Sequence, residues 1–71
     1  MAEEVLSEMV ANVWKVLVAQ GDTVDVGDVL VILESMKMEI PVEAPVAGTV
    51  TELRVAENDV VQEDDVIAII D

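Results

Sequence analysis

The chain contains an internal repeat, and this repeat constrains the fold more than any other feature of the sequence. Residues 11–34 align with residues 48–71 at a shift of 37 positions without a gap, and eight of the 24 aligned positions are identical. The identical pairs are Val13/Val50, Val18/Val55, Ala19/Ala56, Asp22/Asp59, Val24/Val61, Asp28/Asp65, Val29/Val66 and Ile32/Ile69. The repeat predicts two copies of one structural unit, related by an approximate two-fold axis.

Each copy has the pattern of strands. The apolar residues are mostly β-branched, with 16 Val and five Ile against five Leu, and such stiff side chains favour pleated sheet over helix. The expected strands are a partly alternating segment and a later apolar run in each copy: 13–18 and 29–33, then 50–55 and 66–70. A unit this small cannot bury an apolar face alone, so the two copies must cover each other. We therefore expect an all-β sandwich or flattened barrel of about eight short strands.

Turn residues recur at matching positions of the two copies. Gly21 aligns with Asn58, and these residue types best tolerate a positive φ, so we expect a left-handed residue at both places. A second turn is expected at Gly27-Asp28 and at its counterpart, Asp64-Asp65. The repeat thus predicts turns as well as strands.

Residues 35–47 link the copies, and they contain Pro41 and Pro45. A proline cannot donate to a sheet ladder, so this segment is expected at a sheet edge or in an irregular crossing. Symmetry makes the chain ends the counterpart of the bend near Lys37, which places that bend and the termini at opposite ends of the molecule. Residues 3–10 fit either a helical turn or an extended edge strand, and we favour the edge strand.

The composition narrows the possible functions. The 71 residues predict a single domain, 1–71, without cysteine or histidine. This removes disulfides, thiolate metal sites and the commonest general base, and the carboxylates are scattered over turns, so we do not expect an enzyme acting by itself. The net charge of −13 argues against nucleic acid and anionic membranes as partners. It is compatible with a solvated surface and with steering toward basic partners.

No segment of the sequence resembles a membrane span or a signal peptide. The longest aliphatic run, 29–33, is far too short to cross a bilayer. The acidic start at residues 1–4 lacks the basic region and apolar core of a secretory signal. A cytoplasmic location is therefore expected.

Lys37 is the candidate functional residue. It is one of three basic residues beside 16 acidic ones, and two strands around a tight bend would place it at a hairpin tip in water. Met36 and Met38 flank it where a turn normally carries Gly, Asn or Asp. They are either core filler or an exposed surface read by another protein. A tight primed turn would force Met36 and Lys37 to positive φ, at a cost of about 1–3 kcal/mol each.

At these residues the chain resembles the biotinyl/lipoyl attachment domain family. The segment Glu34-Ser35-Met36-Lys37-Met38-Glu39 is similar to the family's biotin-attachment motif, and it lies between the two repeats. The resemblance covers essentially 1–71 and departs from the family at Glu8 and Ala11, where Pro and Gly are common. Three further segments match: Val13-Trp14-Lys15-Val16, Gly21-Asp22 with Gly27-Asp28, and Gly48-Thr49-Val50. The resemblance implies a flattened β-barrel of two four-stranded antiparallel sheets with the modified lysine on a protruding hairpin turn.

The resemblance also implies a stand-alone carrier that is not itself catalytic. A biotin protein ligase would join biotin to Lys37 as an amide, with Met36, Met38, Glu34 and Glu39 as recognition residues. The carrier, a monomer by analogy, would move CO2 as carboxybiotin from a biotin carboxylase to a carboxyltransferase. Lipoate is the alternative cofactor, but lipoyl carriers usually have Asp before the lysine and Ala after it, so Met36 and Met38 favour biotin. An unmodified structural adaptor is the third interpretation.

Overall fold

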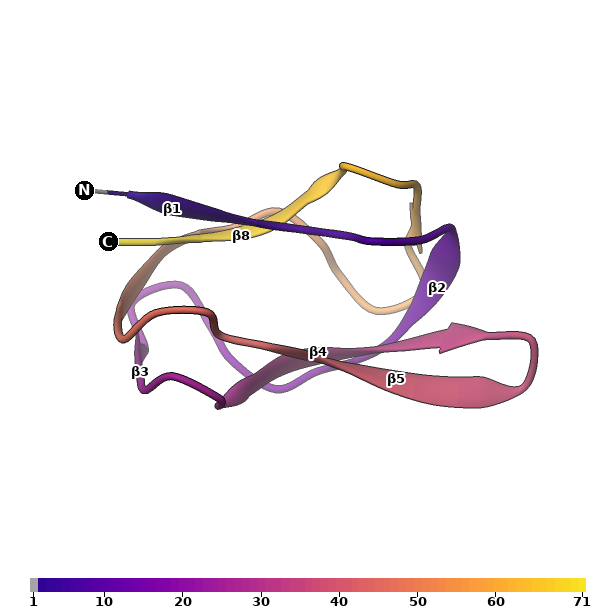
Figure 1. Ribbon diagram of the computed structural model, residues 1–71, viewed down its shortest axis with the longest axis horizontal. Coiled ribbons are helices and arrows are strands. Elements are labelled where there is room, and N and C mark those ends of the chain that lie inside the picture. Colours follow the sequence, from indigo (N-terminus) through magenta and orange to yellow (C-terminus); the bar gives the residue numbers. More distant parts are fainter. Residues whose placement is uncertain (1) are drawn as a thin grey trace.

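The computed structural model describes residues 2–71, which form eight β-strands and no helix (Figure 1). The strands are β1 (Glu3–Leu6), β2 (Ala11–Val16), β3 (Thr23–Val24), β4 (Val29–Ser35), β5 (Met38–Glu43), β6 (Gly48–Leu53), β7 (Val60–Val61) and β8 (Val66–Ile70). They make two four-stranded antiparallel sheets, which confirms the expected all-β fold. The described chain includes no helix able to span a membrane.

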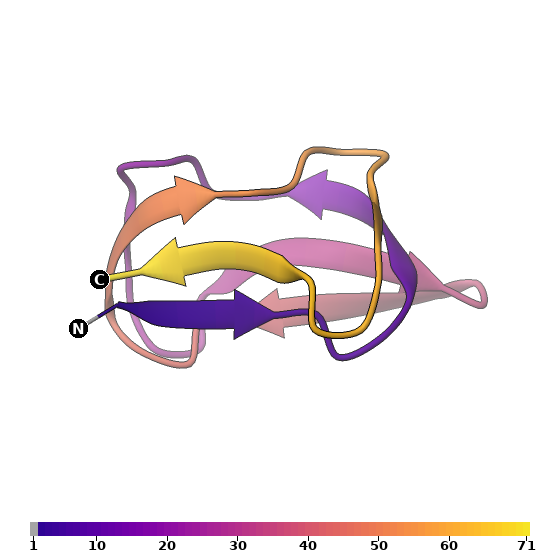
Figure 2. The ribbon, with the colours of Figure 1, turned by 90° about the horizontal axis from the view of Figure 1, so that it is seen from above.

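The two sheets are images of each other under the 37-residue shift. Their strand orders are β1-β8-β6-β3 and β5-β4-β2-β7, and adding 37 to the residues of any strand in the first half gives its counterpart in the second. Each sheet therefore holds two strands from each half of the chain (Figure 2). Neither half forms a complete four-stranded sheet by itself, so both halves are needed to bury the apolar faces.

The structural repeat extends beyond the residues that align by sequence. β1 and β5 are the outer strands of the two sheets, and they occupy equivalent places. Ser7 N–H donates to the Asp65 carbonyl at 2.8 Å, and Ala44 N–H donates to the Asp28 carbonyl at the same distance. β1 confirms the extended edge strand expected in residues 3–10, although it ends at Leu6. β5 likewise confirms that the two prolines lie at a sheet edge or just beyond it.

The first strand of each aligned repeat, β2 or β6, begins and ends earlier than its apolar pattern indicated. β2 spans 11–16 where 13–18 was predicted, and β6 spans 48–53 where 50–55 was predicted. The reason is pairing with β7, which joins Ala11 to Val61 and Asn12 to Val60 and so begins the ladder before the first valine. As a result Arg54, expected inside a strand, lies just after β6.

Four turns of the same design connect the strands. Each is closed by a backbone hydrogen bond and by an aspartate that accepts the N–H of the residue three positions earlier, at 2.8–2.9 Å. These aspartates are Asp22, Asp28, Asp59 and Asp65. The residue before each has a positive φ: Gly21 (99°), Gly27 (91°), Asn58 (78°) and Asp64 (72°). The predicted left-handed positions are thus confirmed, with the geometry of a type II turn.

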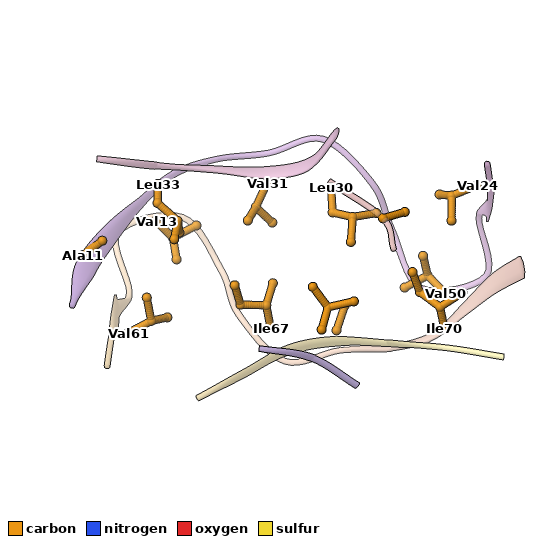
Figure 3. Close-up of a cluster of buried hydrophobic side chains, with 13 residues drawn as sticks. Ala11, Val13, Val24, Leu30, Val31, Leu33, Val50, Val61, Ile67 and Ile70 are labelled. Atoms are coloured by element: carbon orange, nitrogen blue, oxygen red, sulfur yellow. The ribbon is translucent and has the colours of Figure 1, made fainter. Parts of the chain in front are cut away.

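The core lies between the two sheets and is almost wholly aliphatic (Figure 3). Leu30, Leu33, Ile67 and Ile70 are its largest side chains, and all are buried. Ser7 is the buried polar residue of the described chain, and its hydroxyl donates to the Met9 carbonyl at 2.7 Å. The molecule measures 33 × 18 × 17 Å, with both termini at one end of the long axis and the β4–β5 turn at the other (Figures 1 and 2). This confirms the arrangement predicted from symmetry.

Candidate functional site

The β4–β5 hairpin presents Lys37 at its tip. Ser35 pairs with Met38 across the ladder, which leaves Met36 and Lys37 as the two residues of the turn. Their φ values are 52° and 65°, so both are left-handed and the turn is of the primed type that matches strand twist. The predicted positive φ at both residues is confirmed. Non-glycine residues hold this conformation only when the flanking strands impose it.

The hairpin extends beyond the core, as Figure 2 shows. Leu33 and Ile40 form the last pair that contributes to the core, with Leu33 buried and Ile40 half-buried. The two pairs nearer the tip, Glu34/Glu39 and Ser35/Met38, belong neither to the core nor to the residues packed against it. Lys37 therefore stands in water, about four residues or roughly 13 Å of strand from the core pair at Leu33.

The two methionines are exposed, so they are not core filler. Met36 is 92% exposed and Met38 is 64% exposed. Flexible thioether side chains on a surface adapt their shape to a bound partner. Their position on both sides of Lys37 means that a protein enclosing the amine must contact them.

Two carboxylates lie directly below the turn. Glu34 and Glu39 face each other across the ladder, and both are exposed. Within residues 2–71 neither is joined to Lys37 by an ion pair. The structure thus places all five sequence-predicted residues on one hairpin, with the amine unpaired and the acidic pair beside it.

Lys37 differs from the other basic residues in its surroundings. The Lys15 ammonium lies 5.4 Å from the centre of the Trp14 ring, a cation–π contact. Arg54 Nε donates to Glu52 at 3.0 Å. Among residues 2–71 these contacts occupy Lys15 and Arg54, whereas Lys37 has none of this kind. Both lysine side chains are exposed, but only the one at the hairpin tip is without such a contact within residues 2–71.

The site is convex. A groove of about 450 Å³ lies between edge strands β1 and β5, and Lys37 does not line it. Residues 2–71 contain no group of three or more His, Cys, Asp or Glu side chains placed to hold a metal ion. An exposed amine on a narrow projection can enter the active site of another protein. The geometry therefore suits an amine that is modified by a partner enzyme.

Sequence reasoning missed the neighbours that reach the hairpin from other strands. Asn12 of β2 pairs with Glu34 and also with Val60 of β7, so a row of exposed side chains crosses the sheet at the hairpin base. No local pattern joins residues 12, 34 and 60. Only the strand order could have identified them.

The chain was compared with known families, proteins and structures. The family model described as "Biotin-requiring enzyme" matches residues 3–70. A Mycobacterium leprae protein named "Biotinylated protein TB7.3 homolog" is 57% identical over 70 residues, which cover 99% of each chain. The Bacillus subtilis "Biotin/lipoyl attachment protein" is 48% identical over 60 residues, covering 84% of this chain and 82% of that one.

Two solved structures contain a similar domain within much longer chains. The Kluyveromyces lactis urea carboxylase matches with a TM-score of 0.91 and 37% identity, over 99% of this chain and 6% of that one. A single-chain, multi-domain long-chain acyl-CoA carboxylase matches with a TM-score of 0.90 and 26% identity, over 96% and 7% respectively. Because the family model covers nearly the whole sequence and the fold agrees, this chain belongs to the biotin/lipoyl attachment family of biotin-requiring enzymes.

Proposed function

We propose that Lys37 carries covalently attached biotin and that the protein is a carboxyl carrier of a biotin-dependent carboxylase. The observation that carries this proposal is the unpaired Lys37 at the tip of a primed turn between two exposed methionines. Relatives of similar length are named as biotinylated or attachment proteins, and the structural matches are carboxylases. The carrier would serve a biotin carboxylase and a carboxyltransferase as its partners.

The residues present fit an attached biotin. An amide needs one accessible primary amine, and the exposed Met36 and Met38 leave the Lys37 amine open to an incoming carbonyl. Bound biotin supplies a urea nitrogen that holds CO2 during transfer. The hairpin supplies position, because a tether of fixed origin raises the effective concentration of the cofactor at each partner active site.

We propose that a biotin protein ligase makes this attachment. The Lys37 ammonium would lose one proton, and its nitrogen would attack the carbonyl carbon of activated biotin. As the C–N bond forms, the bond from that carbon to the activating group would break, and the nitrogen would release a second proton to give the amide. One positive charge is lost, so the formal net charge of −13 becomes −14. We assign Glu34, Glu39, Met36 and Met38 as contacts of the ligase, without a role in the bond-forming step. We also propose a cytoplasmic location and a monomeric carrier.

Intact mass and peptide mapping test the proposal. The protein is produced with a biotin protein ligase and biotin, and we expect one biotin on the peptide that contains Lys37. Lys37→Arg should abolish the adduct, whereas the control Lys15→Arg should retain it. An unmodified Lys37 under these conditions would contradict the proposal. A lipoyl adduct formed with a lipoyl ligase would instead favour the lipoate carrier, which the name of the Bacillus relative keeps as the alternative.

A further inference from the structure

The internal symmetry provides a control for the exposed residues outside the lysine turn, because each has a counterpart 37 positions away in the same backbone setting. Within residues 2–71, six exposed large hydrophobic residues lie outside the lysine turn, and each has a charged, polar or smaller counterpart. The pairs are Leu6/Glu43, Val10/Ala47, Trp14/Thr51, Leu17/Arg54, Val26/Glu63 and Val60/Thr23. Since one fold accommodates both members of each pair, folding does not require the apolar member.

Trp14 lies on the outer face of the lysine-bearing sheet. The β2–β4 register shifts between Val13 and Lys15, and this bulge leaves Trp14 and Lys15 as consecutive exposed residues. Lys15 pairs with Ile32 of β4, and Ile32 pairs with Pro41 of β5. Trp14, in the bulge, and its neighbour Lys15 thus begin a row of exposed or half-buried residues that continues through Ile32 to Pro41 across three adjacent strands. We call this row, which is apolar apart from Lys15, the Trp14 strip.

The opposite sheet has the same backbone without this strip. Its bulge lies at Thr51, between Val50 and Glu52. Glu52 pairs with Ile69, and Ile69 pairs with Glu4 of β1. The row equivalent to the Trp14 strip is therefore polar and acidic apart from Ile69. The fold therefore does not require the exposed Trp14, which leaves its side chain available for contact with another molecule.

The strip continues into the lysine hairpin. Pro41 is four residues from Lys37 along the hairpin, or roughly 13 Å at the rise of a strand. A typical protein interface covers about 800 Å² per partner, equivalent to a disc of roughly 16 Å radius. Trp14 lies two strands further across the sheet, or about 10 Å. An interface of this size that is centred between Lys37 and the strip would thus cover both. Glu34 and Glu39 lie between the two, so the partner must offer an apolar pocket for Trp14 and basic groups nearer its active site.

We propose that the Trp14 strip docks the biotin protein ligase; this rests on the proposed function. Carboxylase active sites can bind the biotin head itself, which helps them to recognise the loaded carrier. The ligase already holds its activated biotin, so it must choose Lys37 from the protein surface alone. The amine itself does not distinguish Lys37 from Lys15, because both side chains have the same chemistry. Buried tryptophan side chains commonly contribute most of the energy at such interfaces.

The test measures biotinylation of the unmodified protein by a purified ligase with ATP and biotin, followed by mass. Trp14→Thr introduces the residue found at the equivalent bulge, and Pro41→Glu introduces the equivalent Glu4, so the backbone accepts both. The matched control is Val26→Thr, an equally apolar exposed residue in a turn at the end of the molecule that holds the termini. Melting temperatures verify that every variant is folded.

We expect Trp14→Thr and Pro41→Glu to raise the KM for the carrier by about tenfold or more, with kcat within about twofold of the wild type. Val26→Thr should match the wild type, and Trp14→Phe should restore most of the affinity. Wild-type KM in both strip variants would overturn the inference and leave the proposed function intact. Normal loading with slow carboxylation would also overturn it, by assigning the strip to a carboxylase. Failure of the wild type to accept biotin would instead refute the proposed function.

Discussion

Glu34 and Glu39 are directly opposed on β4 and β5, so two carboxylates face each other one pair below the lysine turn. Like charges in opposed strand positions destabilise a sheet. Within residues 2–71 no ion pair relieves this repulsion. The pair lies between Lys37 and the Trp14 strip, where a basic partner surface would neutralise it. Such a pair is complementary to a basic partner surface, and it slightly lowers the stability of the free protein.

Neutralising either carboxylate should therefore make the free protein more stable and weaken its binding to the ligase. We expect Glu34→Gln and Glu39→Gln each to raise the free energy of unfolding by a few tenths of a kcal/mol, because the cross-strand repulsion is removed. The same variants should raise the ligase KM. Urea denaturation and biotinylation kinetics measure the two effects. The control is Asp25→Asn, in the turn between β3 and β4 at the other end of the molecule. Unchanged ligase kinetics in both variants would show that these carboxylates are not ligase contacts.

The strained turn makes a second prediction. Met36 has a φ of 52°, a conformation that asparagine tolerates far better than methionine. Met36→Asn should stabilise the unmodified protein by about 1 kcal/mol in urea denaturation. Met38→Asn is the control, since Met38 begins β5 outside the left-handed region and should gain nothing. A destabilised Met36→Asn would mean that the turn is not strained.

The four aspartate turns should respond in symmetric pairs. The Asp22 carboxylate accepts the Ala19 N–H at 2.8 Å, and Asp59 accepts the Ala56 N–H at 2.9 Å. Asp22→Ala and Asp59→Ala should each lower the free energy of unfolding by about 1 kcal/mol, because each leaves a turn N–H without its acceptor. Asp25→Ala removes a carboxylate from the same region without removing such a bond, so it is the control. Thermal unfolding provides the comparison, and strongly unequal losses would contradict the two-fold design.

Gly48 should not accept a side chain. A Cβ there would lie 2.9 Å from Ile70 Cγ2 and 3.0 Å from the Asp71 carbonyl oxygen, and the oxygen belongs to the backbone. We expect Gly48→Ala to destabilise the protein by about 1–3 kcal/mol, since β6 and the end of β8 must move apart. The exposed neighbour Ala47 is the control, and Ala47→Ser should leave the urea midpoint unchanged. A wild-type midpoint for Gly48→Ala would show that the chain end yields freely.

Local chemistry determined much of this protein in advance. β-branched residues identified the apolar strands, and Gly21 and Asn58 identified left-handed turns, because φ preference and side-chain stiffness belong to single residues. The 37-residue repeat then required a two-fold arrangement, with Lys37 and the termini at opposite ends. Lys37 could be singled out by its neighbours in sequence, since the whole turn is one short segment.

Pairing between distant residues was decided only by the tertiary structure. β7 joins β2, and β3 joins β6, so each half of the chain completes the other's sheet. Pairing with β7 is the reason that β2 begins at Ala11. The register across β2, β4 and β5 places Trp14 and Lys15 in one row with Ile32 and Pro41. Register depends on which face of every strand is buried at once, and no local pattern contains that information. The sequence alone therefore identified the lysine, whereas the surface beside it emerged only when the strands were paired.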